Sequence, residues 1–166
     1  MREAYINECK QIKQNAEYTA EAHHAIACFQ KRLALGLQTV PAGIAAFSGA
    51  WVAAGQTSTQ WLWLTVISAV VASVASVLNP NKAYAEHLNA AKNFTTIKHD
   101  ARALHQAFGQ RMTDEAFAIA VENLHEKYND LVKVSPPTTD RSFKKAQQKI
   151  QSNAHEPDKD KDGNLK

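Results

Sequence analysis

The chain has 166 residues, two cysteines and a formal net charge of +3 at pH 7. Binding of nucleic acid usually needs a concentrated basic face, whereas the cations here alternate with acidic residues, so we expect no direct nucleic-acid binding. Once its two long apolar runs are set aside, the remainder can form helical arms but is too short for a separate catalytic domain of ordinary size.

The N-terminal arm is expected to be helical. Small, apolar and uncharged residues recur along it at three- and four-residue steps, the spacing of one helix face. They form a narrow seam that consists of Tyr5, Cys9, Ile12, Ala16, Thr19, His23, Ile26 and Gln30. Because this seam leads into the first apolar run without a break, we predict one long helix from about residue 3 to residue 54.

The middle of the chain, residues 33–81, carries no charged side chain. Two apolar runs, 33–54 and 61–78, are separated there by a short polar turn. A bilayer core about 30 Å thick needs roughly 20 apolar residues of helix, and both runs fit. We therefore predict an all-α membrane protein with a two-helix transmembrane hairpin. The alternative is a soluble bundle with one buried apolar hairpin, but neither run keeps the charged stripe of a soluble helix.

The flanks of the hairpin predict its orientation. Basic residues precede the first run and follow the second, whereas the turn is uncharged; the nearest are Lys31, Arg32 and Lys82. The positive-inside rule then places both termini in the cytoplasm. All three tryptophans lie beside the turn, where indole rings favour the headgroup level of a bilayer; they are Trp51, Trp61 and Trp63. No signal peptide is expected, because the first 30 or so residues are polar.

Small residues spaced four apart occur in both runs and predict close contacts between helices. In the first run they include Ala42, Ala46 and Gly49, and in the second they include Ala72. One stripe from each run is expected to close the hairpin itself. The remaining stripes are available to neighbouring copies, so we expect a homo-oligomer within the lipid bilayer.

A pore through such an assembly needs polar lining, and few side chains can supply it. The candidates are Gln38, Ser68 and Ser76, and no ionisable residue accompanies them, so a conduit is expected to be weakly selective. Pro41 removes a backbone donor and predicts a kink that can act as a gate. Both features also have ordinary explanations, because serine often bonds backbone or a neighbouring helix and kinks are common in membrane helices.

The C-terminal part is expected to contain further helices that pack by apolar stripes. Asn79-Pro80-Asn81 predicts an end and a restart, and Gly109 is expected to end the helix that follows. The stripe of that helix consists of Leu88, Ala91, Phe94, Ile97, Ala101, Leu104 and Phe108. Thr113 predicts the N-cap of the next helix. Its buried face consists of Phe117, Val121, Leu124, Tyr128 and Leu131.

The end of the chain completes the predicted domain organisation. Pro136 and Pro137 stop the preceding helix, and Asp140 is expected to cap a short basic helix that ends at Gln151. We interpret residues 1–151 as a single domain: a cytoplasmic helix (1–32), the two transmembrane helices (33–54 and 61–78), and cytoplasmic helices (81–151) that pack as a bundle. The polar tail, 152–166, is expected to be disordered.

The sequence shows no sign of catalysis or of a bound cofactor. It lacks a nucleophile elbow, a phosphate-cradling glycine loop and a paired cysteine motif. The seven histidines are expected on helix surfaces, without cysteine or carboxylate at metal-ligand spacing. Cys9 and Cys28 fall on the cytoplasmic side, where thiols stay reduced, and are interpreted as packing residues. We therefore expect neither an enzyme nor a metal site.

The order of a polar helix, two closely spaced apolar runs, an Asn-Pro exit and a charged helix is similar to the SLATT family of small bacterial two-span proteins. The likeness covers about residues 17–151 and includes His87, Ala90, Ala91, Phe94 and Arg102, then Pro136-Pro137, Asp140, Phe143, Ala146 and Ile150. Phe94 stands where we expect a tyrosine in the family. The resemblance implies an effector of nucleotide-signalled conflict systems. Such an effector oligomerises and breaches the bacterial inner membrane when a linked nucleotide-signalling enzyme or sensor protein detects infection.

Three interpretations of the function stay open at this point. The first is the oligomerising, pore-forming effector that the resemblance implies. The second is a passive two-span anchor or scaffold whose cytoplasmic helices recruit a partner. The third is a soluble bundle that inserts into a membrane only conditionally. The surplus of small-residue stripes favours the first.

Overall fold

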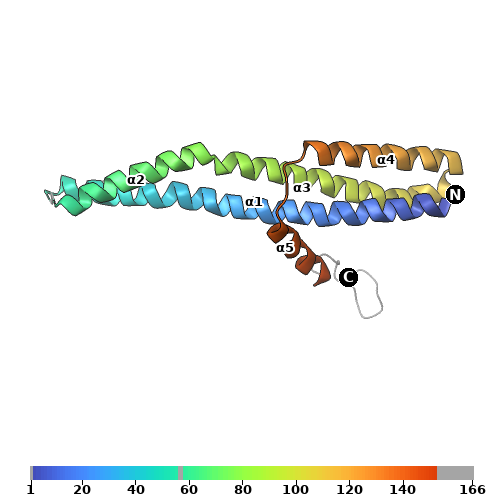
Figure 1. Ribbon diagram of the computed structural model, residues 1–166, viewed down its shortest axis with the longest axis horizontal. Coiled ribbons are helices and arrows are strands. Elements are labelled where there is room, and N and C mark those ends of the chain that lie inside the picture. The colour runs from blue at the N-terminus through green and yellow to red at the C-terminus, as the bar shows by residue number, and fades with distance from the viewer. Residues whose placement is uncertain (1, 56–57, 153–166) are drawn as a thin grey trace. The chain divides into compact units, whose positions relative to one another are not determined.

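The computed structural model describes residues 2–55 and 58–152, and this part of the chain is all-helical. Its α-helices are α1 (Arg2–Ala53), α2 (Thr59–Leu78), α3 (Pro80–Ala103), α4 (Asp114–Val134) and α5 (Asp140–Gln151) (Figure 1). Between α3 and α4 lie a π-helical turn, η1 (Leu104–Phe108), and a 3₁₀ turn, η2 (Gly109–Arg111). The all-α prediction is confirmed for these residues. The tail predicted to be disordered lies outside them from residue 153 onward.

The first helix ends follow the predicted signals. α1 continues from the polar arm through the first apolar run and keeps Pro41 inside it. α2 ends where Asn79 adopts a left-handed conformation, with φ of 42° and ψ of 58°, and the Asn79 N–H donates to the carbonyl of Ala75 at 3.1 Å. Pro80 then begins α3, at a position where a backbone N–H has no partner within the helix. The predicted exit and restart are therefore confirmed.

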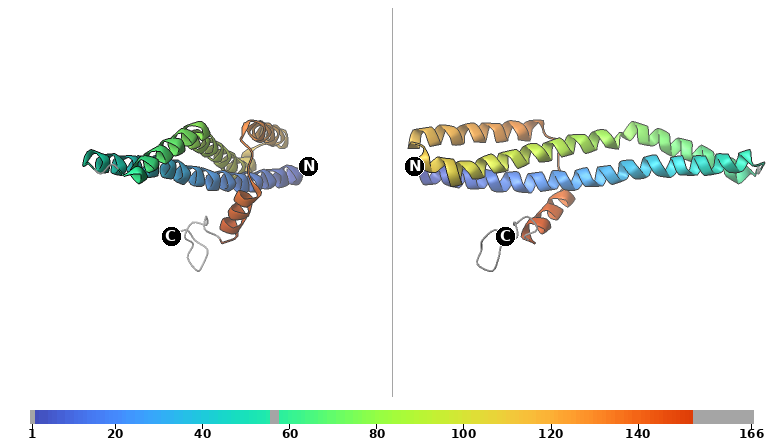
Figure 2. Two further views of the ribbon diagram at one scale, coloured as in Figure 1. Left: turned by 60° about the vertical axis from the view of Figure 1, so that its left-hand side comes forward. Right: turned by 180° about the vertical axis from the view of Figure 1, so that it is seen from behind.

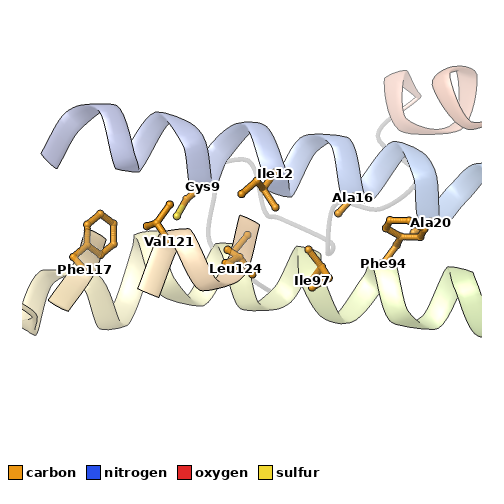
Figure 3. Packing of buried hydrophobic residues seen from close by; sticks show 10 residues of the cluster. Cys9, Ile12, Ala16, Ala20, Phe94, Ile97, Phe117, Val121 and Leu124 are labelled. Carbon is orange, nitrogen blue, oxygen red and sulfur yellow. The ribbon is translucent and has the colours of Figure 1, made fainter. Parts of the chain in front are cut away.

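The chain divides into two compact units. We call the part up to Ile26 and from Glu86 onward the bundle unit, and the part from Ala27 to Ala85 the apolar unit. In the bundle unit, α1 lies alongside α3 and α4 (Figure 2). Small side chains of α1 pack against larger ones of α3 and α4 (Figure 3). The buried cluster consists of Cys9, Ile12, Ala16, Ala20, Phe94, Ile97, Ala101, Phe117, Val121 and Leu124.

The connection between α3 and α4 corrects two predictions. The predicted stripe includes Phe108 and stops at Gly109, yet Phe108 is 63 % exposed and Gly109 is buried with a helical φ of −58°. The π-helical turn η1 explains the first difference, because its i to i+5 bonding turns Phe108 away from the face that Leu104 presents to the core. Lack of space for a side chain explains why glycine occupies position 109 although it does not end the helical segment. A Cβ on Gly109 would lie 2.5 Å from the carbonyl oxygen of Leu104 and 2.6 Å from Cε2 of Phe117.

Polar caps begin α4 and α5. The hydroxyl of Thr113 accepts the N–H of Ala116 at 3.3 Å, as the sequence predicts. The predicted cap of α5 is wrong by one residue, because Thr139 caps that helix and Asp140 is its first residue. Thr139 and Ser142 satisfy each other's backbone N–H groups in a reciprocal capping box. Asp140 remains in the first turn, where its charge favours the helix dipole.

Charged and aromatic side chains join α1 to the other helices of the bundle unit. The contacts reach α3, α4 and α5, so the N-terminal arm is part of this unit rather than a separate projection. They are Glu17–Lys98 at 2.9 Å, Arg2–Asp114, Glu21–Lys149 at 2.7 Å, and the stacked rings of Tyr18 and Phe143 with centroids 5.9 Å apart.

The apolar unit shows the opposite distribution of side chains. Two helical stretches, Arg2–Ala53 and Thr59–Arg111, each contain an 18-residue window that is long and apolar enough to cross a membrane, and only 17 % and 6 % of those windows are buried. Large side chains such as Trp63 and Val77 are 63 % and 86 % exposed. Side chains of this kind are normally buried in a soluble core. The apolar window within each stretch is therefore a candidate membrane span by length and composition.

Candidate functional site

A groove between α1 and α2 gathers most of the candidate residues. It lies within the apolar unit and has a volume of about 620 Å³. Gln38, Pro41 and Ala42 line it from α1, and Ser68, Ala72 and Ser76 line it from α2. The groove exists because α1 contributes several alanines there and α2 contributes alanine and serine, and these short side chains leave space. Two other candidates, Ala46 and Gly49, do not line the groove and are exposed.

Pro41 and Ser68 both line this groove and form a polar contact between its two helices. Ser68 is 4 % exposed, and its hydroxyl donates to the carbonyl oxygen of Pro41 at 2.5 Å. The proline ring cannot donate to the carbonyl of Leu37, so α1 lacks one of its own hydrogen bonds at this turn. The hydroxyl of Ser68 supplies a bond between the helices close to that weakened turn. The kink and gate predicted at Pro41 stay predictions.

A second polar contact, between two hydroxyl groups, joins the helices closer to the turn. Ser48 is 1 % exposed, and its hydroxyl lies 3.0 Å from that of Thr65. Each hydroxyl also bonds a backbone carbonyl of its own helix, that of Ala45 for Ser48 and that of Trp61 for Thr65. These groups therefore stabilise the helix pair. Gln38 and Ser76 are the exposed polar candidates that remain along the groove.

The groove offers binding space but no acid or base. No titratable side chain is among the described residues that line it. Near the turn, the rings of Phe47, Trp51 and Trp61 form a cluster with centroids 5.3 to 5.7 Å apart. Trp63 is exposed outside this cluster. The predicted grouping of the tryptophans beside the turn is thus visible, and two of the three contact each other.

The bundle unit contains a polar pair that the sequence reasoning missed. All seven histidines are predicted on helix surfaces, but His23 of α1 is only 1 % exposed. Its Nδ1 lies 2.9 Å from Nδ1 of His87 on α3, with ring centroids 5.1 Å apart. The His23 ring also stacks on Phe94, with centroids 5.6 Å apart and planes 13° apart. The sequence held a signal, because His87 precedes Phe94 by seven residues and so shares its helix face.

Burial decides the protonation of this pair. It lowers the pKa of His23 from 6.5 to about 4, and the nearby His87 and His24 act in the same direction. Burial also lowers the pKa of His87, although the charge of Glu86 opposes this. Both rings are therefore neutral at pH 7, and one Nδ1 donates a hydrogen bond to the other. In the described part of the chain, no group of three or more His, Cys, Asp or Glu residues could hold a metal ion.

The two cysteines differ from each other. Cys9 belongs to the buried cluster, and burial, assisted by Glu8, raises the pKa of its thiol to about 11. The packing role predicted for Cys9 is therefore confirmed. Cys28 is exposed, so the same prediction is wrong for that residue. Cys28 follows the buried residue Ala27, but successive residues of an α-helix point in different directions, so Cys28 lies on an exposed face of α1.

No family model, curated protein or solved structure matches the chain.

Proposed function

We propose that the apolar unit is a membrane hairpin, in which residues 33–53 of α1 and the whole of α2 cross a lipid bilayer. The observation that carries this proposal is the outward exposure of its large apolar side chains, combined with hydroxyls that bond between the two helices. Soluble monomers rarely expose apolar patches larger than a few hundred Å². Apart from the carbonyl of Leu37, which Pro41 cannot bond, the two continuous helices can satisfy their backbone groups internally, as a bilayer requires.

We place this hairpin in the bacterial inner membrane with both termini in the cytoplasm. Lys31 precedes the apolar part of α1, and its Nζ lies 6.0 Å from the ring centre of Tyr84, just after α3 begins. Cationic and aromatic side chains together are typical of a membrane interface. The cluster of Phe47, Trp51 and Trp61 suits the opposite interface, beside the uncharged turn.

The function we propose is that of an oligomerising effector that permeabilises the membrane in a bacterial conflict or anti-phage system, as the resemblance to the SLATT family implies. The two sets of small residues support assembly. All four candidates are exposed, but only Ala42 and Ala72 line the groove, so Ala46 and Gly49 are left outside it. A Cβ on Gly49 would meet no atom within 4 Å, so this part of α1 is open to close approach by a neighbouring copy.

The conduit formed by such an assembly would be weakly selective. Gln38 and Ser76 supply its exposed polar groups, and no charged residue occurs between residues 33 and 81 to form a selectivity ring. The trigger in this proposal is a linked nucleotide-signalling enzyme or sensor protein that acts on the bundle unit. The chain itself is proposed to act without catalysis.

A scaffold is the second candidate function. The bundle unit exposes large apolar side chains, among them Phe108, Ile119 and Val134, which a protein partner can cover. In this case the hairpin is a passive anchor. Recruitment of a partner would then be lost on mutation of these side chains, while membrane permeability would stay the same.

Thiol labelling tests the orientation. Cys28 is exposed and is the better cytoplasmic reporter, because Cys9 is buried with a raised thiol pKa. We expect an impermeant maleimide to label Ser58→Cys in intact cells, in a Cys28→Ser background, and to label Cys28 of the unmodified chain only after lysis. Labelling of Cys28 in intact cells would refute the proposed topology.

Liposome leakage with purified full-length protein tests the function. Gly49→Leu should reduce both the oligomer population and the leakage, because it blocks close approach at an exposed site. Val40→Leu is the matched control, since it enlarges an exposed side chain on the opposite face of α1. Equal leakage by the two variants would show that Gly49 does not contribute to the contact between neighbouring copies. An inserted, partner-bound protein that never leaks would favour the scaffold.

A further inference from the structure

The proposed function makes no use of the contact between His23 and His87. A hydrogen bond between two Nδ1 atoms requires one protonated and one unprotonated nitrogen. Two neutral rings meet this requirement with opposite tautomers. One added proton keeps the bond, but when His23 carries it the charge lies on a ring that is stacked against Phe94 and shielded from water. A second added proton makes both Nδ1 atoms donors at a separation of 2.9 Å, and they repel.

We propose that His23 and His87 form a proton-sensitive latch, which holds α1 against α3 while both rings are neutral and opens when acid protonates them. The latch acts within the bundle unit, close to the points along the chain where α1 enters the apolar unit and where α3 leaves it. Its release would loosen the helices that continue into the proposed membrane hairpin.

The neighbouring charges leave the direction of this effect unchanged. His24 disfavours protonation of His23, whereas Glu86 favours protonation of His87. Glu21 on α1 is paired with Lys149 of α5, and Glu17 is paired with Lys98 of α3. On α4, Tyr128 contacts Phe94, and burial raises the pKa of its phenol, so it stays neutral across the acid range.

The sign of the pH dependence follows from the depressed pKa of His23. The unfolded chain takes up this proton near pH 6.5, whereas the folded chain takes it up only near pH 4. The stabilisation is therefore complete above about pH 6.5 and is lost as the pH falls from there toward 4. Between pH 7.5 and pH 5, His23 alone should lower the folding equilibrium constant roughly 30-fold, with a further contribution from His87.

Unfolding of the full chain in detergent micelles at pH 7.5 and pH 5 tests the latch. The double variant His23→Leu and His87→Leu removes both titrating groups and replaces them with apolar side chains. Between pH 7.5 and pH 5 the folding equilibrium constant of the wild type should fall by a factor at least roughly tenfold larger than that of the double variant. His99→Asn is the control, because His99 is exposed on α3. His105→Asn is measured in parallel, since burial and nearby lysines also lower the pKa of His105. Equal acid sensitivity of the wild type and the double variant would overturn the proposal.

Nitrogen NMR of the histidine-labelled wild type keeps the test independent of any variant. We expect a through-bond coupling between the two Nδ1 atoms at pH 7.5 that disappears on acidification, with His23 titrating well below pH 6.5. Two rings that titrate normally without coupling would refute the latch.

The role of the latch in activity rests on the proposed function. Protons that enter through a first pore would then open the latch in further copies of the chain. Lowering the pH to 5 should therefore increase liposome leakage by the wild type more than leakage by the double variant. If NMR shows the latch opening while leakage stays the same at both pH values, the latch stands and its role in permeabilisation is refuted. If leakage is absent at both pH values even with the trigger protein added, the proposed function fails independently of the latch.

Discussion

The bundle unit buries large apolar side chains at its core, whereas the apolar unit exposes them. The bundle unit buries Phe94, Phe117 and Val121 among three helices, whereas the apolar unit buries Ser48 and Ser68 and exposes its large apolar residues. Both units share α1, a single helix of 52 residues. The first half of α1 has one apolar face and packs against other helices, whereas its second half is apolar all round. The distribution of side chains therefore indicates which environment each half suits.

Phe117→Ala should have the largest effect on the bundle unit. Truncating a buried aromatic side chain to alanine costs about 3–5 kcal/mol, and Phe117 is 1 % exposed. Chemical denaturation of the protein in micelles measures this loss. Phe108→Ala is the matched control, because Phe108 is largely exposed and should change stability by less than about 0.5 kcal/mol.

The same variant sharpens the effector proposal. If the bundle unit restrains the hairpin, Phe117→Ala should leak constitutively in liposomes while it remains inserted. If the bundle unit builds the oligomer, the variant should be silent, and we favour constitutive leakage. If Phe117→Ala is destabilised but keeps wild-type permeability and wild-type oligomers, the bundle unit does not control permeability.

A charge on α2 should interfere with insertion of the apolar unit into a membrane. Val70→Lys places an ammonium near the middle of α2 on an exposed position, which costs about 2.5–3.5 kcal/mol if that surface faces lipid. Val132→Lys on α4 also alters an exposed valine and should be nearly neutral in water. Alkaline extraction of membranes measures insertion of both. Equal extraction of the two variants would argue against a membrane position for α2.

Gly109→Ala tests the tight connection between α3 and α4. The added Cβ would lie 2.5 Å from a backbone carbonyl oxygen, which cannot move freely, so we expect a loss of about 1–3 kcal/mol in unfolding free energy. Gly36→Ala is the control in the apolar unit, where a Cβ meets nothing within 4 Å. That change should be neutral or stabilising, since alanine favours helix more than glycine.

Thr113→Ala should have the smallest effect. It removes the hydroxyl that accepts the Ala116 N–H and should cost about 1 kcal/mol. Thr96→Ala provides the comparison, because this exposed hydroxyl bonds a carbonyl within α3 and does not cap a helix. Thermal unfolding distinguishes the two, and equal midpoints would mean that the cap at Thr113 contributes little.

Much of the fold was predictable because short-range rules govern helix ends and helix faces. Asn79 and Pro80 end and restart a helix through their own backbone preferences, and Ile12, Ile97 and Val121 follow the helical period. The groove residues were only partly predictable. Small side chains at Ala42 and Ala46 look alike in the sequence, yet only Ala42 lines the groove, because that depends on how α2 packs against α1.

The helical class, the two apolar runs and the polar segment between them can be predicted from the amino-acid sequence, since they depend on local periodicity and hydropathy. The packing of the helices is needed to explain which small residues face each other, why Gly109 must lack a side chain, and that Ser68 bonds the carbonyl of Pro41. It also brought together His23 and His87, which are 64 residues apart. The physical reason is that such contacts depend on the register between helices, and no local preference of a single helix sets that register.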